Sequence, residues 1–233
     1  MRAADPIAPT MTDELLPGIE LETAPGPTAS VIWLHGLGAD GNDFVPIVPE
    51  LGLPGSLPTR VVFPHAPIRA VTINNGMRMR AWYDITGADL YNRADLVGVR
   101  QSQAQLEALI AREGARGMRP ERIVVAGFSQ GGAIALYTGL RHGARLAGIM
   151  ALSTYLIAPD RLAAEASAAN RTVPVFMAHG TADPVLRFDW GQASQAALAA
   201  AGYQVEWHTY RMQHAVCLEE IQAIGAWLRR VLS

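Results

Sequence analysis

The pentapeptide GFSQG at residues 127–131 combines a serine with two flanking glycines at a spacing that can make the serine a nucleophile. A β-rich run precedes it at 122–126, and a helix-like run begins at Gly132. In a G-x-S-x-G turn between a strand and a helix, the serine takes a strained conformation and exposes its hydroxyl, while the glycines let strand and helix approach closely. The backbone N–H of Gln130 lies at the positive end of the expected helix, where it can stabilise an oxyanion. We therefore predict Ser129 as a nucleophile.

A serine hydroxyl needs a base to take its proton and an acid to orient that base. After a nucleophile turn of this kind, the acid and the histidine follow in that order, on loops after later strands. Asp183 lies in the turn HGTADPV at 179–185, after a β-rich run, and is the predicted acid. It could instead serve only the turn, since Asp-Pro pairs are common in turns. Asp160, which reads as a helix cap, and Asp189, inside a helical pattern, are weaker alternatives.

Two histidines follow Asp183 and could serve as the base. His214 lies in the loop between the alternating run 204–210 and the last helical pattern, which is where a catalytic histidine is expected. His208 falls inside that run and reads as a solvent-facing strand residue. His179 precedes the acid turn and is expected to brace it. We therefore predict His214 as the base.

The second donor of an oxyanion hole should come from a loop after an earlier central strand. The apolar run 31–34 ends in HGLGADG at 35–41, whose glycines permit tight turns. We expect the N–H of Leu37 to join that of Gln130, with His35 shaping the loop. The loop lacks the G-x-x-x-x-G-K-[ST] pattern of a phosphate cradle, so it does not indicate a nucleotide site.

Alternating strand and helix patterns must position these residues. Strand-like runs occur at 30–34, 60–63, 123–126, 146–152, 173–178 and 204–210, and helical patterns at 96–112, 132–141, 188–201 and 216–231. The alternation predicts an α/β fold, with a mostly parallel central sheet covered by helices on both faces. Two stretches, 66–91 and 154–172, resist assignment apart from a short helix around 163–166. We expect both to cover the site.

Composition excludes several classes of function. The chain has 233 residues, which suits one domain over 11–233, with 1–10 as a disordered extension. A formal net charge of -2 gives no electrostatic footprint for nucleic acid or an anionic membrane, and no apolar run is long enough to span a bilayer. Cys217 is the only cysteine, which suits the reducing cytoplasm and reads as a small buried hydrophobe rather than a nucleophile. No ligand pattern for a metal occurs.

With these residues in place, the chain resembles the acyl-protein thioesterase, or phospholipase/carboxylesterase, family of α/β-hydrolases, in its bacterial carboxylesterase branch. The similarity covers about residues 34–228 and lies in the motifs LHGLGADG (34–41), FPHAP (63–67), WYD (82–84), GFSQGG (127–132) and HGTAD (179–183). It implies an α/β-hydrolase fold, a triad of Ser129, Asp183 and His214, oxyanion donors at Leu37 and Gln130, and no cofactor. Gln213 departs from the family, many members of which have glycine before the histidine.

Together the residues and the resemblance predict a serine carboxylesterase acting on esters, or thioesters, of small to medium acyl chains. Acyl-protein thioesterase and lysophospholipase activities remain alternatives, and so does a ligand receptor without catalysis. The expected partners are a small-molecule or lipid ester or an acylated protein, and a homodimer remains open. The resemblance and the apolar composition suggest that the acyl channel is lined by Leu37, Met79, Trp82, Tyr155, Leu156 and Leu186.

Overall fold

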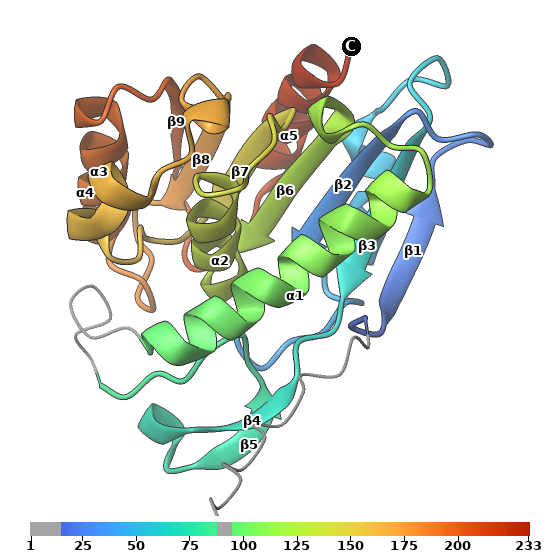
Figure 1. Ribbon diagram of the computed structural model, residues 1–233. Coiled ribbons are helices and arrows are strands. Elements are labelled where there is room, and N and C mark those ends of the chain that lie inside the picture. Colours follow the sequence, from blue (N-terminus) through green and yellow to red (C-terminus); the bar gives the residue numbers. More distant parts are fainter. Residues whose placement is uncertain (1–14, 88–94) are drawn as a thin grey trace, which may run out of the picture.

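A seven-stranded sheet forms the centre of the computed structural model, which describes residues 15–87 and 95–233 (Figure 1). Its strand order is β1-β3-β2-β6-β7-β8-β9. Every neighbouring pair is parallel except β1 and β3, which are antiparallel. The strands are β1 (Gly18–Glu22), β2 (Ala29–Leu34), β3 (Thr59–Pro64), β6 (Ile123–Phe128), β7 (Gly148–Leu152), β8 (Val175–Gly180) and β9 (Val205–Tyr210). The predicted α/β-hydrolase architecture is confirmed.

Helices cover both faces of this sheet. They are α1 (Leu96–Ala115), α2 (Gln130–Gly139), α3 (Leu162–Glu165), α4 (Phe188–Ala200) and α5 (Leu218–Val231). Because side chains alternate along a strand, Ile32 and Leu34 pack under α1 and α2, whereas Val31 and Trp33 pack on the side of α5. The central strands are buried on both faces, which explains their unbroken apolar runs.

The strand order brings two loops together at one edge. From β2 the chain first adds β3 on one side and later places β6 on the other, so the chain direction switches at β2 and β6. The loops that follow these two strands therefore lie at the switch point, which is where open α/β sheets bind ligands. These are the loops that contain Leu37 and Ser129.

A two-stranded hairpin lies beyond this edge of the sheet (Figure 1). It consists of β4 (Ile68–Val71) and β5 (Met77–Arg80), which pair antiparallel. Gly38 N–H donates to Arg80 O over 2.9 Å, and the Arg80 guanidinium donates to Ala66 O over 2.9 Å. The hairpin is thus tied directly to the loop after β2.

All six predicted strand runs are strands, and the four longer helices begin and end within three residues of their predicted limits. The sequence did not predict β1 or the hairpin. The stretch 154–172 contains α3 and two short 3₁₀ turns. The extension predicted at 1–10 lies outside the described residues. Among the described helices, none has the length and apolar content needed to cross a lipid bilayer.

Candidate active site

Ser129 occupies a strained turn between β6 and α2. Its φ of 54° and ψ of -122° are unusual for a residue with a side chain. A Cβ at Gly131 would lie 2.5 Å from Leu34 O, and one at Gly127 would overlap the backbone of Gly131. The backbone of Ser129 is also fixed, because its N–H donates to Leu152 O over 2.8 Å. The expected nucleophile turn is therefore present, and only glycine fits at its two flanking positions.

The three residues predicted as a triad meet at the carboxyl ends of β6, β8 and β9. His214 Nε2 lies 3.0 Å from Ser129 Oγ, and His214 Nδ1 lies 2.7 Å from Asp183 Oδ2. The Asp183 side chain is fully buried, whereas His214 is partly exposed. The imidazole is also packed against the Phe128 ring, with 4.7 Å between ring centroids. This arrangement can move a proton from a hydroxyl to an imidazole whose other nitrogen faces a carboxylate.

The acid loop and the histidine loop are joined by backbone contacts. Ala182 N–H donates to Met212 O over 3.1 Å, and Thr181 N–H donates to Tyr210 O over 2.8 Å. A Cβ at Gly180 would lie 2.5 Å from Met212 O, so the loops leave no room for a side chain there. Gln213 is exposed and has no positive φ, so its larger side chain causes no backbone strain.

The alternative acids and bases have other surroundings. Asp189 pairs with Arg187 on the exposed first turn of α4. Asp160 is an exposed residue of a 3₁₀ turn and does not cap a helix, contrary to the expectation. His208 is half-buried and stacks on Phe176, with 4.8 Å between centroids, so it is less exposed than predicted.

The loop after β2 reaches Ser129. A Cβ at Gly36 would lie 3.5 Å from Ser129 Cβ, which places Leu37 immediately beside the turn. In the described part of the chain, no hydrogen bond joins the N–H of Leu37 or of Gln130 to another group. Both amides can therefore donate to an oxygen placed between them and the serine.

His35 shapes this loop as a neutral imidazole. Its Nε2 accepts from Ala66 N–H at 3.0 Å, so its proton lies on Nδ1, which donates to Gly36 O at 2.7 Å. Burial lowers the pKa of His35 to about 4. The expected structural role of His35 fits these contacts.

The Gln130 side chain makes a contact that sequence reasoning missed. Its Oε1 accepts from Trp82 N–H and its Nε2 donates to Tyr83 O, both at 2.8 Å. The Trp82 indole in turn donates to His35 O at 2.8 Å. These bonds connect the nucleophile turn, the oxyanion loop and the segment after β5. They span more than 40 residues of sequence, and no local pattern predicts them.

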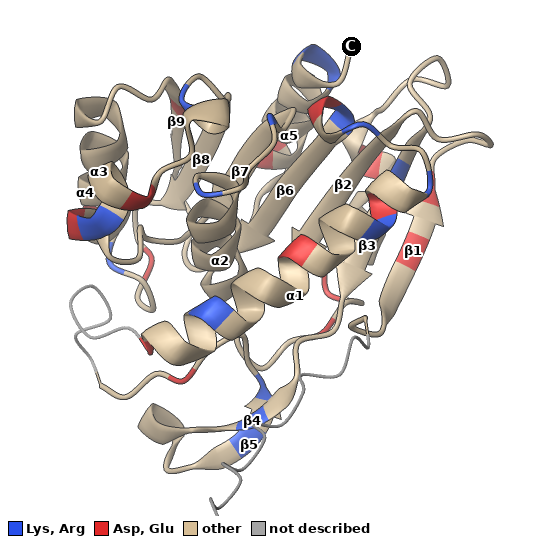
Figure 2. Cartoon of the chain, viewed as in Figure 1, with Lys and Arg blue, Asp and Glu red and all other residues tan. Residues whose placement is uncertain are grey.

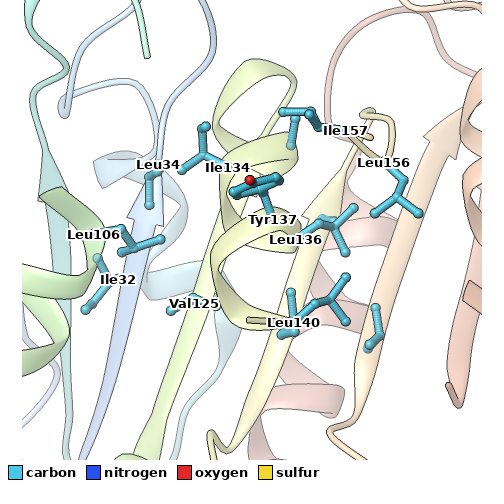
Figure 3. Close-up of a cluster of buried hydrophobic side chains, with 14 of the residues drawn as sticks. Ile32, Leu34, Leu106, Val125, Ile134, Leu136, Tyr137, Leu140, Leu156 and Ile157 are labelled. Atoms are coloured by element: carbon cyan, nitrogen blue, oxygen red, sulfur yellow. The ribbon is translucent and has the colours of Figure 1, made fainter. Parts of the chain in front are cut away.

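Four of the six residues suggested for an acyl channel are buried in the core. Trp82, Tyr155, Leu156 and Leu186 are buried in the cluster between the sheet and its helices, where Figure 3 shows Leu156 beside β8. Tyr155 Oη lies 2.8 Å from the Tyr83 hydroxyl, and burial raises its pKa to about 12. Only Leu37 and Met79 are partly exposed. Four of the six side chains suggested for the channel are therefore buried, and the channel stays a prediction.

Cys217 also differs from the expectation. It is half-buried at the N-cap of α5 rather than buried. Burial raises the pKa of its thiol, which disfavours the thiolate. Across residues 15–87 and 95–233, no cluster of three His, Cys, Asp or Glu side chains could hold a metal ion.

Comparisons with known proteins agree with this geometry. Residues 21–232 match the family described as phospholipase/carboxylesterase. The acyl-protein thioesterase 1 of Neurospora crassa is 40% identical over 210 residues, which cover 86% of each chain, and that of Mycosarcoma maydis is 40% identical over 221 residues, covering 88% of this chain and 92% of the relative.

Solved structures give the same picture. Arabidopsis thaliana SOBER1 superposes with a TM-score of 0.82 at 30% identity, covering 88% of this chain and 99% of the other. Zea mays acyl-protein thioesterase 2 superposes with a TM-score of 0.78 at 30% identity, covering 93% and 100%. The chain therefore belongs to the phospholipase/carboxylesterase family of α/β-hydrolases, and it is a serine hydrolase that cleaves carboxylic esters.

Proposed function

We propose that Ser129, His214 and Asp183 carry out this hydrolysis through an acyl-enzyme. The supporting observation is the continuous hydrogen-bonded path from Ser129 Oγ through His214 to Asp183, with distances of 3.0 and 2.7 Å. Ser129 Oγ attacks the acyl carbonyl while His214 Nε2 takes its proton, and Asp183 stabilises the resulting imidazolium. His214 then returns the proton to the leaving alcohol or thiol. Water attacks the acyl-enzyme by the same route and releases the acid.

The backbone amides of Leu37 and Gln130 are the proposed oxyanion donors. The Gln130 N–H lies at the N-terminus of α2, where the helix dipole favours negative charge. Glycine at position 36 lets the loop after β2 approach Ser129. Two amides that are already oriented stabilise the charge without reorganising during the reaction.

The proposed substrates are esters and thioesters of small to medium acyl chains. The names of the fungal and maize relatives support thioester cleavage from acylated proteins as an alternative. The family description likewise keeps lysophospholipids open. We propose the cytoplasm as the compartment, because a single cysteine suits a reducing environment. One domain over residues 11–233 fits the single central sheet.

Hydrolysis of p-nitrophenyl esters from acetate to palmitate, measured with wild type and Ser129→Ala, tests this proposal. A Ser129-dependent maximum at short or medium chains would support the carboxylesterase. A maximum at palmitate, together with cleavage of an S-palmitoylated peptide, would favour the acyl-protein thioesterase. Absence of Ser129-dependent turnover, with no labelling by an organophosphonate probe, would favour a ligand receptor and contradict the mechanism.

A further inference from the structure

His179 lies one residue before the end of β8 and is buried beside the acid of the triad. Its Nε2 lies 2.9 Å from Leu186 O and 3.5 Å from Asp183 Oδ2. Because a carbonyl oxygen only accepts, the proton of the neutral imidazole lies on Nε2. Nδ1 is then left with a lone pair. It is buried without a hydrogen-bond partner among the described residues, and it faces the backbone of α4 at Gly191.

The surroundings of His179 hold the ring in one orientation. Phe188 meets it edge-on, with 6.0 Å between centroids, and the Trp207 ring lies 6.3 Å away. A Cβ at Gly191 would lie 2.9 Å from His179 Cε1, so α4 approaches the ring as closely as a glycine allows. Burial lowers the pKa of His179, and a proton on Nδ1 would meet no acceptor. The imidazole therefore stays neutral and fixed.

Leu186 connects His179 to the acid. Asp183 Oδ1 accepts from Val185 N–H at 2.8 Å and from Leu186 N–H at 2.9 Å, which leaves Oδ2 for His214. The orientation of the carboxylate thus depends on the position of Leu186. The Leu186 carbonyl is in turn held by His179. A chain of hydrogen bonds therefore runs from His179 through Leu186 to Asp183.

We propose that His179 is a positioning residue, whose Nε2–H fixes Leu186 and thereby directs Asp183 Oδ2 toward His214. It touches neither substrate nor reacting atoms and acts only through the acid loop. This inference rests on the proposed triad and adds a fourth side chain to its support. Its essential feature is a donor at the Nε2 position rather than a ring or a charge.

Two substitutions separate the donor from the ring. His179→Gln keeps an N–H donor near the Nε2 position, whereas His179→Phe keeps a ring without a donor. We expect His179→Phe to lower kcat about 10- to 100-fold with little change in KM, as for a misplaced catalytic group. The acidic limb of the kcat/KM profile should also shift to lower pH, because a poorly directed Asp183 supports the His214 imidazolium less well. His179→Gln should keep kcat within about threefold of wild type.

His208 provides the matched control, because it lies on β9 opposite Ala178 and also stacks on a buried aromatic ring. His208→Phe should leave kcat and the pH profile unchanged. Equal kcat in His179→Phe, His179→Gln and wild type would overturn the inference, and so would equal losses in both variants. If His179→Phe does not fold, His179→Asn, whose donor sits near the Nδ1 position, replaces it and should show the same loss. Ser129→Ala is measured alongside, since loss of Ser129 dependence would contradict the triad itself rather than the role of His179.

Discussion

The carboxyl ends of β6, β8 and β9 carry Ser129, Asp183 and His214, and we call this part of the sheet the catalytic edge. It and the neighbouring β4–β5 hairpin differ in how firmly the chain holds them. Ser129 and Asp183 are buried, and their backbones are fixed by several hydrogen bonds and by glycines with no room for a side chain. The hairpin instead exposes large apolar side chains, with Ile68 56%, Ile73 46% and Met77 63% exposed. Its arginines appear as blue segments of β4 and β5 in Figure 2.

The difference in rigidity suits the two regions to different tasks, positioning of the reacting groups and selection among acyl chains. Attack at a carbonyl requires groups held within a fraction of an ångström, which buried loops on a rigid sheet provide. Selecting among acyl chains requires apolar surface that substrates can reach. Of the six side chains suggested for the channel, the two that are partly exposed are Leu37 and Met79, and Met79 lies on the hairpin. We therefore expect substitutions at the edge to change kcat and those in the hairpin to change chain-length preference.

Ser129→Ala should give the largest effect and tests the edge directly. Removing the proposed nucleophile should lower kcat about 10⁵- to 10⁶-fold, because the proposed base and oxyanion donors then have no attacking oxygen to act on. Turnover of p-nitrophenyl butyrate measures the loss. The unfolding temperature should not fall, because replacing Ser129 with alanine removes no packing contact. Activity near that of wild type would contradict the assignment.

Asp183→Asn should have the next largest effect, about 10⁴-fold on kcat. The amide can present its N–H to His214 and thereby stabilise the wrong tautomer. Asp189→Asn is the matched control, since that aspartate lies six residues later on an exposed helix turn. We expect less than about a twofold change for the control. A similar loss of kcat in both variants would show that an amide at either position impairs turnover. It would contradict a specific catalytic role for Asp183.

The same division explains what could be predicted from the sequence. Ser129, Asp183 and His214 each follow a strand, and Ser129 lies between two glycines while Asp183 precedes a proline, so strand ends, these turn residues and chain order were enough to predict them. The Gln130 contacts with Trp82 and Tyr83 join residues more than 40 positions apart, which no local pattern predicts. The contact of His179 with Leu186 is local, and His179 was expected to brace the acid turn. Burial of Tyr155, Leu156 and Leu186 was missed for a similar reason, because apolar residues suit a core and a pocket equally well. The strand β1 was missed because its alternating GIELE pattern is short and lies on a half-exposed edge.

Gln130→Met extends the comparison to the bonds between the edge and the segment that follows β5. Methionine keeps the length of the side chain and leaves the backbone N–H in place, but Trp82 N–H and Tyr83 O lose their partners. Each unpaired buried group should cost about 1–3 kcal/mol of unfolding free energy. We expect kcat to fall about 10-fold as the oxyanion loop loses its support through Trp82. Gln192→Met on the exposed side of α4 is the control and should change neither quantity.

Glu220 gives the edge a pH-dependent stability. Its carboxyl is fully buried in the first turn of α5, and burial raises its pKa from about 4.5 to about 8. Between these values the unfolded chain has released the proton while the folded chain retains it, so stability falls as the pH rises and levels off above about 8. Glu220→Gln cannot ionise and should lose this decline. The unfolding temperatures of the two proteins should diverge by about 3–8 °C between pH 6 and pH 8. Glu219→Gln, an exposed neighbour, should follow wild type, and parallel curves for wild type and Glu220→Gln would refute the prediction.

Met79→Ala should have the smallest effect and addresses the hairpin alone. The Met79 sulfur lies 3.4 Å from Asn74 Nδ2 and would be 3.7 Å from a Cβ at Gly38, so this partly exposed side chain borders the oxyanion loop. Removing its apolar surface should raise KM for long-chain esters about 3- to 10-fold and leave acetate hydrolysis unchanged. Met77→Ala, two residues away on the same strand and more exposed, should change neither the KM for long-chain esters nor that for acetate. If Met79→Ala instead lowered kcat for every chain length, the hairpin would belong to the catalytic edge, and the separation between positioning and selection would fail.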